Sequence, residues 1–277
     1  MKGLNLGCGT RFHPDWTNID VSGESSQVQP HDVRDSLPFP DDTFDVVYHS
    51  HLLEHLPKEQ ALPFCRECYR VLKGGGIIRV VVPDLERIAK LYLHALDAAI
   101  NNSQPNHDYT WMMIELYDQV VRDRPGGAML EYLKQDPIPN ESMVYDRLGD
   151  EARRIVQRLR DPVRETDHSA VRGTWLDDLC RLRDRLRTAI MRRLLSQADY
   201  EALQLGRFRL SGEIHQWMYD RYSLCRLLEA SGFQAPKQRT EFDSAIDHWA
   251  QFNLDTDNNG MAYKPDSLYV EASKASS

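Results

Sequence analysis

The stretch Leu4-Asn5-Leu6-Gly7-Cys8-Gly9-Thr10 decides the fold of this chain. A short buried run, residues 4–6, leads into a turn with two glycines, and glycine lets the backbone approach a ligand without a Cβ in the way. In open α/β sheets, ligands bind beyond the carboxyl ends of the strands. The stretch therefore predicts a ligand-binding turn at the edge of a mostly parallel sheet.

A second apolar run, residues 16–21, follows this turn and contains Asp20 near its end. A carboxylate at the end of the second strand can accept hydrogen bonds from both hydroxyls of a ribose, and it would repel a 2′-phosphate. We therefore expect Asp20 to bind an unphosphorylated ribose.

The same region departs from the dinucleotide-binding fingerprint. That fingerprint needs a third glycine three positions after the second, and this chain has Phe12 there. The short distance from Gly9 to Asp20 leaves little room for a full first helix, whose N-terminus would otherwise hold a pyrophosphate. A nucleoside ligand without phosphate fits better, and S-adenosylmethionine is such a ligand.

The rest of the chain supports an α/β fold with an interruption. Residues 44–48 and 77–82 have the pattern of strands, residues 59–72 have helical spacing, and Gly74-Gly75-Gly76 is predicted to stop that helix. Strands joined by crossovers predict a parallel sheet. We expect seven mostly parallel strands in a Rossmann-like sheet with helices on both sides, built from residues 1–92 and 211–277.

Residues 93–210 form the predicted helical insertion, because they contain helical patterns and no convincing strand. An amphipathic helix is predicted over 176–194, and a capping box at Ser196 to Asp199 begins another helix that ends at Gly206. The Arg-rich stretch 147–193 is interleaved with acids. It is typical of a solvated helix face, and a basic rim for an anionic acceptor is the alternative.

Composition excludes several classes of protein. The formal net charge is −8 over 277 residues, which argues against nucleic-acid binding because phosphate contacts need Lys and Arg. No apolar run is long enough to span a membrane, and Met1 leads almost directly into a strand without a leader. We therefore expect a cytoplasmic protein. The odd cysteine number argues against a disulfide framework, and Cys65 and Cys68 are interpreted as structural. His51 and His55 are four residues apart with His49 nearby, but no matched carboxylate spacing supports a metal, so no metal site is predicted.

Taken together, these motifs resemble class I S-adenosylmethionine-dependent methyltransferases, and more narrowly the small bacterial ones found beside glycan-assembly enzymes. The resemblance covers about 1–92 and 212–277. It rests on residues 4–10, 18–20, Asp32 with 37–47, 53–56, 70–76, 82–84, 215–220 and 224–233. The chain differs from the family pattern at Arg11, where many members have a third glycine.

The resemblance implies a cofactor, S-adenosylmethionine, with S-adenosylhomocysteine as product, and roles for matching residues. Asp20 would hold the ribose, Asp32 would accept from the adenine amino group, and the backbone N–H of Val33 would donate to the ring. Arg11 is a candidate for the methionine carboxylate. The full set of expected cofactor-binding residues is Gly7, Cys8, Gly9, Arg11, Asp20, Val21, Asp32, Val33, His49 and Ser50.

A hydroxyl acceptor also needs a general base, and the expected catalytic residues are Asp84, His215 and His51. Asp84 follows a strand at the ligand edge of the sheet, although it is equally suited to N-capping the next helix. His215 comes after the insertion and either reaches the site or packs with Trp217. His55 is a further candidate, but packing or capping at a helix start is the favoured interpretation for it.

The predicted function is transfer of a methyl group to an oxygen or nitrogen of a small-molecule or glycan acceptor, with the insertion as an acceptor-binding lid. Two alternatives remain open. One is another S-adenosylmethionine-using enzyme on the same fold, because fold does not determine chemistry. The other is a catalytically silent cofactor-binding protein.

Overall fold

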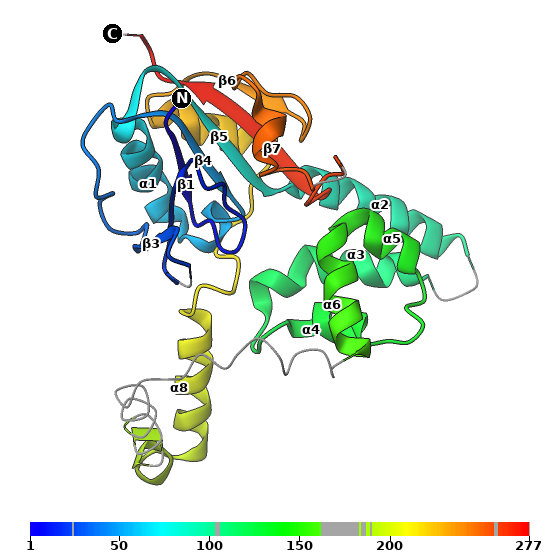
Figure 1. Ribbon diagram of the computed structural model, residues 1–277. Helices are drawn as coiled ribbons and strands as arrows, with labels where there is room; N and C mark the ends of the chain where they lie inside the picture. Colours follow the sequence, from blue (N-terminus) through cyan, green and yellow to red (C-terminus); the bar gives the residue numbers. More distant parts are fainter. Residues whose placement is uncertain are drawn as a thin grey trace.

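The computed structural model describes residues 1–23, 25–102, 106–161, 183, 187–188, 190–257 and 260–276. Seven strands form one sheet in the order β3-β2-β1-β4-β5-β7-β6 (Figure 1). Their bounds are β1 Gly3–Leu6, β2 Thr17–Asp20, β3 Val28–Pro30, β4 Phe44–Ser50, β5 Leu72–Pro83, β6 Gln234–Arg239 and β7 Ser267–Ser273.

The strands are parallel except for β7, which runs antiparallel to both β5 and β6. The order reverses at β1, so the carboxyl ends of β1 and β4 lie side by side, and loops leave them in opposite directions. Such a switch point is where open sheets bind ligands. The predicted Rossmann-like, seven-stranded, mostly parallel sheet of class I methyltransferases is confirmed.

The two faces of the sheet are covered differently. One face packs against α1 (Lys58–Val71) and α9 (Arg221–Ala230) in a core that includes Phe64 and Leu224. The other face packs against the 3-10 helix η3 (Trp249–Phe252) and the chain around it. Helices thus cover both sides as expected, although the second face is covered by the short 3-10 helix η3.

Gly74, Gly75 and Gly76 do not separate a helix from a strand, which corrects another expectation. β5 begins at Leu72, directly after α1, and runs through all three glycines. A Cβ on Gly76 would lie 2.8 Å from Leu72 Cγ and 2.9 Å from the Asp45 carbonyl oxygen. The close approach of β4 and β5 therefore requires glycine at this position.

A second apolar core holds the first part of the insertion together. It forms between α2 (Leu85–Ile100), α3 (His107–Val121), α4 (Gly127–Leu133), α5 (Glu141–Leu148) and α6 (Asp150–Arg160). Trp111 belongs to this core and is fully buried. Helical structure begins at Leu85, before the expected boundary at 93, so α2 links the sheet to the insertion (Figure 1).

The last described helix of the insertion, α8 (Gln197–Arg209), extends away from both cores (Figure 1). The Ser196 hydroxyl accepts from the Asp199 N–H, as the predicted capping box requires. The helix continues through Gly206 to Arg209, three residues beyond the predicted end. Most of the amphipathic helix predicted over 176–194 falls outside the described residues. Among the described helices, none has the length and apolar character needed to cross a bilayer.

Candidate functional site

The turn after β1 is held in a left-handed conformation against β2. Gly7 and Gly9 have φ values of 62° and 51°, a region that favours glycine. The N–H groups of Gly7 and Cys8 donate to the Ile19 carbonyl at 2.9 and 3.2 Å. A Cβ on Gly7 would lie 2.7 Å from Leu52 Cδ1. The left-handed backbone therefore favours glycine at both positions, and Gly7 also leaves room for the Leu52 side chain.

Asp20 lies at the end of β2 and contacts this turn directly. Its Oδ2 accepts from the Gly9 N–H at 2.9 Å, and its Oδ1 accepts from the Ser22 N–H at 2.9 Å. The carboxylate is thus oriented by backbone donors at the edge of the turn, where the sequence places a ribose-binding group.

A cavity of about 210 Å³ opens beside the turn. Its roof comes from the C-terminal part of the chain, through Leu254, Tyr263 and Lys264. Its remaining walls come from the ends of β1 and β4, and these residues are Asn5, Gly7, Cys8, Gly9, Thr10, Arg11, Tyr48, Ser50 and His51.

Arg11 joins the turn to this roof. Its guanidinium donates to the carbonyls of Asn253, Leu254 and Thr256, and it lies 4.0 Å from the centre of the Tyr263 ring. The side chain therefore has a structural partner that the sequence did not indicate. Its expected contact with the methionine carboxylate stays a prediction, since Arg11 also lines the cavity.

A buried network anchors the same roof to the sheet. Arg79 on β5 forms ion pairs with Asp255 and Glu271, each at 2.7 Å, and these side chains are at most 3% exposed. Asp255 also accepts from the Tyr48 hydroxyl at 2.7 Å and from the Trp249 indole at 2.9 Å. Paired and hydrogen-bonded charges of this kind hold the roof segment in one position.

Five predicted cofactor residues are not among those that line this cavity. One of them is Asp20, which contacts the turn through the Gly9 N–H and whose role toward the ribose stays a prediction. Val33 belongs to the core, and Val21 is exposed. Asp32 pairs with Arg34, which lowers the pKa of Asp32. The expectation for His49 is corrected: strand alternation turns Tyr48 toward η3 and His49 to the opposite face, where it packs on Phe64 and is fully buried. Burial lowers the pKa of His49 to about 4.

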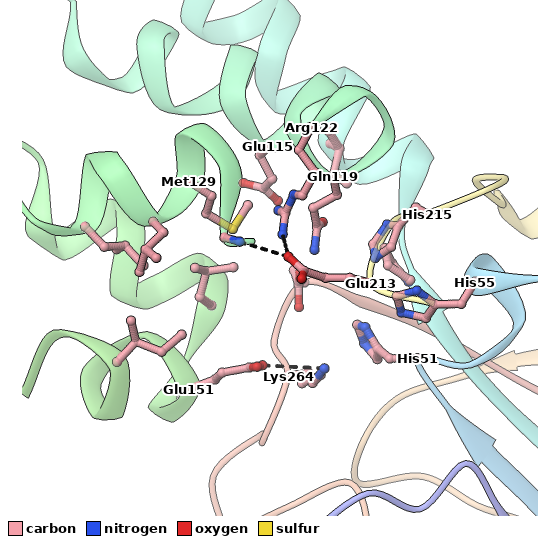
Figure 2. A pocket seen from close by; sticks show the side chains of 18 residues that line it. His51, His55, Glu115, Gln119, Arg122, Met129, Glu151, Glu213, His215 and Lys264 are labelled. Carbon is pink, nitrogen blue, oxygen red and sulfur yellow. Dashed lines mark hydrogen bonds and ion pairs between the residues drawn. The ribbon is translucent and has the colours of Figure 1, made fainter. Parts of the chain in front are cut away.

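A larger cavity, of about 290 Å³, lies between the sheet edge and the insertion. Its apolar wall comes from the insertion and is formed by Ile88, Met129, Leu130, Leu133, Leu148 and Ile155. His51, His55 and His215 gather at the opposite end (Figure 2). The other polar lining residues are Glu115, Gln119, Arg122, Glu151, Glu213, Lys264 and Asp266, and of these Glu115, Gln119 and Glu151 come from the helices of the insertion.

Most charges in this cavity are paired. Glu213 accepts from the Gly126 N–H at 2.8 Å and forms an ion pair with Arg122 at 3.3 Å. Lys264 lies 3.4 Å from Glu151 of α6. Burial alone would lower the pKa of Lys264, but the charge of Glu151 and its neighbours outweighs this and raises it, so the amine stays protonated.

Two of the predicted catalytic histidines lie together at the polar end, and His55 joins them. The rings of His55 and His215 meet edge to face with centroids 4.8 Å apart. His51 Nδ1 lies 3.2 Å from Glu54 Oε1, and its Nε2 lies 2.8 Å from the Ser267 hydroxyl. His51 also has a φ of 50°, a strained conformation that persists where surrounding structure imposes it.

Glu54 is the centre of this group, and the sequence had offered no role for it. The side chain is fully buried. Burial alone would raise its pKa, but the contact with His51 and the charges of His215 and His55 lower it to about 2. Burial lowers the pKa of His215 to about 3. The sequence does contain one indication that Glu54 is buried. It stands among leucines in Leu52-Leu53-Glu54-His55-Leu56, whereas an exposed acid usually has polar neighbours.

Asp84 does not reach either cavity. Its Oδ1 accepts from the Arg87 N–H at 3.1 Å, so it N-caps α2. The structure therefore favours the capping interpretation over the catalytic one, and the expectation that Asp84 contacts the acceptor is corrected.

Comparisons with known proteins agree with this geometry. Residues 4–80 match the family model described as "Methyltransferase domain". The chain is similar to the ubiquinone/menaquinone biosynthesis C-methyltransferase UbiE of Citrobacter koseri, 42% identical over 130 residues, covering 43% of this chain and 47% of that protein. The enzyme of the same name from an Enterobacter species is 42% identical over 79 residues, covering 27% of this chain and 30% of that protein. The chain thus spans about half, or less, of the length of these curated relatives.

Among solved structures, one described as a SAM dependent methyltransferase from Archaeoglobus fulgidus aligns with 99% of this chain and 86% of its own, at 12% identity and a TM-score of 0.39. The family match, by contrast, covers the strands and turns that form the smaller cavity. Residues 4–80, less than half of the chain, therefore form a methyltransferase domain that uses S-adenosylmethionine, and this domain supplies strands β1 to β4 of the sheet.

Proposed function

We propose that the protein transfers a methyl group from S-adenosylmethionine in the smaller cavity to an acceptor in the larger one. One observation carries this proposal: His51 and Lys264 line both cavities. The two spaces therefore meet at these side chains. Methyl transfer is an in-line displacement that depends on alignment of the nucleophile with the sulfonium, and two adjoining sites provide such an alignment.

The lining of the larger cavity indicates the kind of acceptor. Its aliphatic wall suits an apolar body, since burial of apolar surface is favourable at about 25 cal/mol per Å². Its histidine end suits a polar group that carries the nucleophile, an oxygen or a nitrogen. A small molecule that has an apolar body and a polar nucleophilic group, or a lipid-linked glycan, would therefore fit the larger cavity. A free sugar would leave the aliphatic wall without an apolar partner.

Carbon methylation is a second candidate, because the curated relatives are named C-methyltransferases of ubiquinone and menaquinone biosynthesis. A prenylated aromatic ring also has an apolar body and a polar end. The similarity to these relatives covers less than half of this chain. The choice between methylation of carbon and methylation of oxygen or nitrogen therefore depends on which acceptor the larger cavity binds.

Turnover with methyl-labelled S-adenosylmethionine tests the proposal. Phenolic, amine and lipid-linked sugar acceptors are supplied separately, and the labelled position in the product is located by NMR. We expect label on oxygen or nitrogen together with S-adenosylhomocysteine. Label on a ring carbon would favour the second candidate, and cofactor consumption without any methylated product would indicate a different S-adenosylmethionine enzyme.

Filling the larger cavity should separate acceptor binding from cofactor binding. In a Met129→Trp variant the indole occupies space on the apolar wall, so we expect kcat/KM for the acceptor found above to fall roughly 10- to 100-fold. Affinity for S-adenosylhomocysteine should change by no more than about 2-fold, because Met129 does not line the smaller cavity.

Met191→Trp provides the matched control, since Met191 lies outside both cavities. It should leave kcat/KM near the wild-type value. If Met129→Trp turns over as fast as Met191→Trp, the larger cavity is not the acceptor site.

A further inference from the structure

We propose that Glu54, His55 and His215 bind a divalent transition-metal cation at the polar end of the larger cavity. One carboxylate oxygen and two imidazole nitrogens of these residues lie within 4.8 Å of one another. Glu54 and His55 come from the 3-10 helix η1 (Leu53–His55), and His215 comes from the loop before α9.

The cluster has buried donor atoms without partners. Glu54 is fully buried and His215 is 3% exposed. Among the described residues, His51 Nδ1 forms an ion pair with Glu54 Oε1 at 3.2 Å, whereas Glu54 Oε2 and His215 Nδ1 have no hydrogen-bond partner. A buried carboxylate oxygen or imidazole nitrogen without a partner is costly, and such groups are normally hydrogen-bonded or coordinate a metal. A cation between these side chains would satisfy both residues at once.

The spacing suits a metal after a small adjustment. Zn²⁺ binds imidazole nitrogen and carboxylate oxygen at about 2 Å in a tetrahedral arrangement, so two ligand atoms are about 3.3 Å apart. Donors that lie within 4.8 Å of one another therefore need to close by no more than about 1.5 Å, a movement within reach of side-chain rotation.

The backbone around the ligands is already organised. His55 Nδ1 lies 3.1 Å from the Ile214 carbonyl, and a metal-bound histidine typically donates its other N–H to such a group. The Glu54 carbonyl accepts from the N–H groups of Gln216 and Trp217 at 2.6 and 3.2 Å. These bonds hold the two ligand segments together although His55 and His215 are 160 positions apart in the sequence.

His51 acts as a positioning residue in this arrangement. Its Nδ1 is 3.2 Å from Glu54 Oε1, and its Nε2 contacts the Ser267 hydroxyl. Hydrogen-bonded partners of a ligating carboxylate fix its orientation toward the metal. The left-handed backbone conformation of His51 would orient its imidazole toward Glu54, which explains why the strained conformation is kept.

The donor set selects the class of cation. Two imidazoles and one carboxylate suit Zn²⁺ or Fe²⁺, whereas Mg²⁺ and Ca²⁺ prefer oxygen donors. His55 and His215 line the larger cavity (Figure 2), so coordination positions left open by the protein face the acceptor. Resting on the proposed function, the cation would bind a polar atom of the acceptor and orient it toward the cofactor.

Zinc titration of the full-length, chelator-treated protein tests the site. By calorimetry we expect one Zn²⁺ per chain, with affinity on the order of 100-fold lower in Glu54→Gln, His55→Gln and His215→Ala. His94→Ala removes an exposed histidine of α2 and should bind as the wild type does. Thermal unfolding of each variant confirms that it is folded. Because His55 is only half-buried, we expect His55→Gln to disturb the fold less than the other two substitutions.

Absence of saturable Zn²⁺ binding to the wild type would overturn the proposal. So would folded His55→Gln or His215→Ala protein that binds Zn²⁺ as tightly as the wild type. Titration of the same samples with S-adenosylhomocysteine reports on the cofactor site separately, so failure of the metal site and failure of the proposed function are distinguishable.

Discussion

An Asp20→Ala variant is expected to bind S-adenosylhomocysteine about 100-fold more weakly than the wild type, a loss of about 2.7 kcal/mol. The wild-type carboxylate would accept hydrogen bonds from the ribose hydroxyls, and bonds to a charged group each contribute about 1.5–3 kcal/mol. Asp20 also accepts from the Gly9 N–H at 2.9 Å, so the substitution loosens the turn as well. Isothermal titration calorimetry of the full chain measures the effect directly.

Asp97→Ala is the matched control, because Asp97 is an exposed residue of α2 far along the chain from the turn. Its affinity for S-adenosylhomocysteine should equal that of the wild type within about 2-fold. Equal affinities of the Asp20 and Asp97 variants would show that Asp20 does not hold the ribose.

Arg79→Met is expected to reduce the free energy of unfolding by about 3–5 kcal/mol. The substitution keeps much of the side-chain volume but leaves the carboxylates of Asp255 and Glu271 buried without their cation. Since Asp255 belongs to the segment that roofs the smaller cavity, affinity for S-adenosylhomocysteine should fall as well. Thermal and urea-induced unfolding measure the first effect.

Lys73→Met on the same strand tests whether burial is the cause. Lys73 pairs with Asp45 at 2.7 Å, but the two side chains are 43% and 38% exposed. Exposed pairs contribute no more than about 1 kcal/mol, so this variant should unfold near the wild-type midpoint. A Lys73 variant as unstable as Arg79→Met would contradict the account of the buried network.

The parts of the fold that local chemistry determines could be predicted from the sequence. The turn at Gly7 and Gly9 and the carboxylate that ends β2 depend on neighbouring residues, and both occur where the sequence placed them. The family match over residues 4–80 confirms the choice of cofactor that these motifs indicated. Asp84 was ambiguous because a strand-end acid suits catalysis and helix capping equally.

Features that depend on contacts between distant segments could not be predicted. The two faces of β4 are both buried, so no polar alternation showed that His49 would turn into the core. The roof segment around Leu254 and Tyr263 has no regular hydrophobic period. The approach of His215 to Glu54 requires the insertion to return the chain to the sheet edge, and nothing within either segment indicates that contact.

A crystal structure of the full-length protein with S-adenosylhomocysteine tests the central claim most directly. We predict adenosine beside the turn at Gly7 and Gly9, with the sulfur at the junction formed by His51 and Lys264 and facing the larger cavity. A sulfur atom that faces solvent, with the insertion cavity closed off from it, would contradict the assignment of the two cavities.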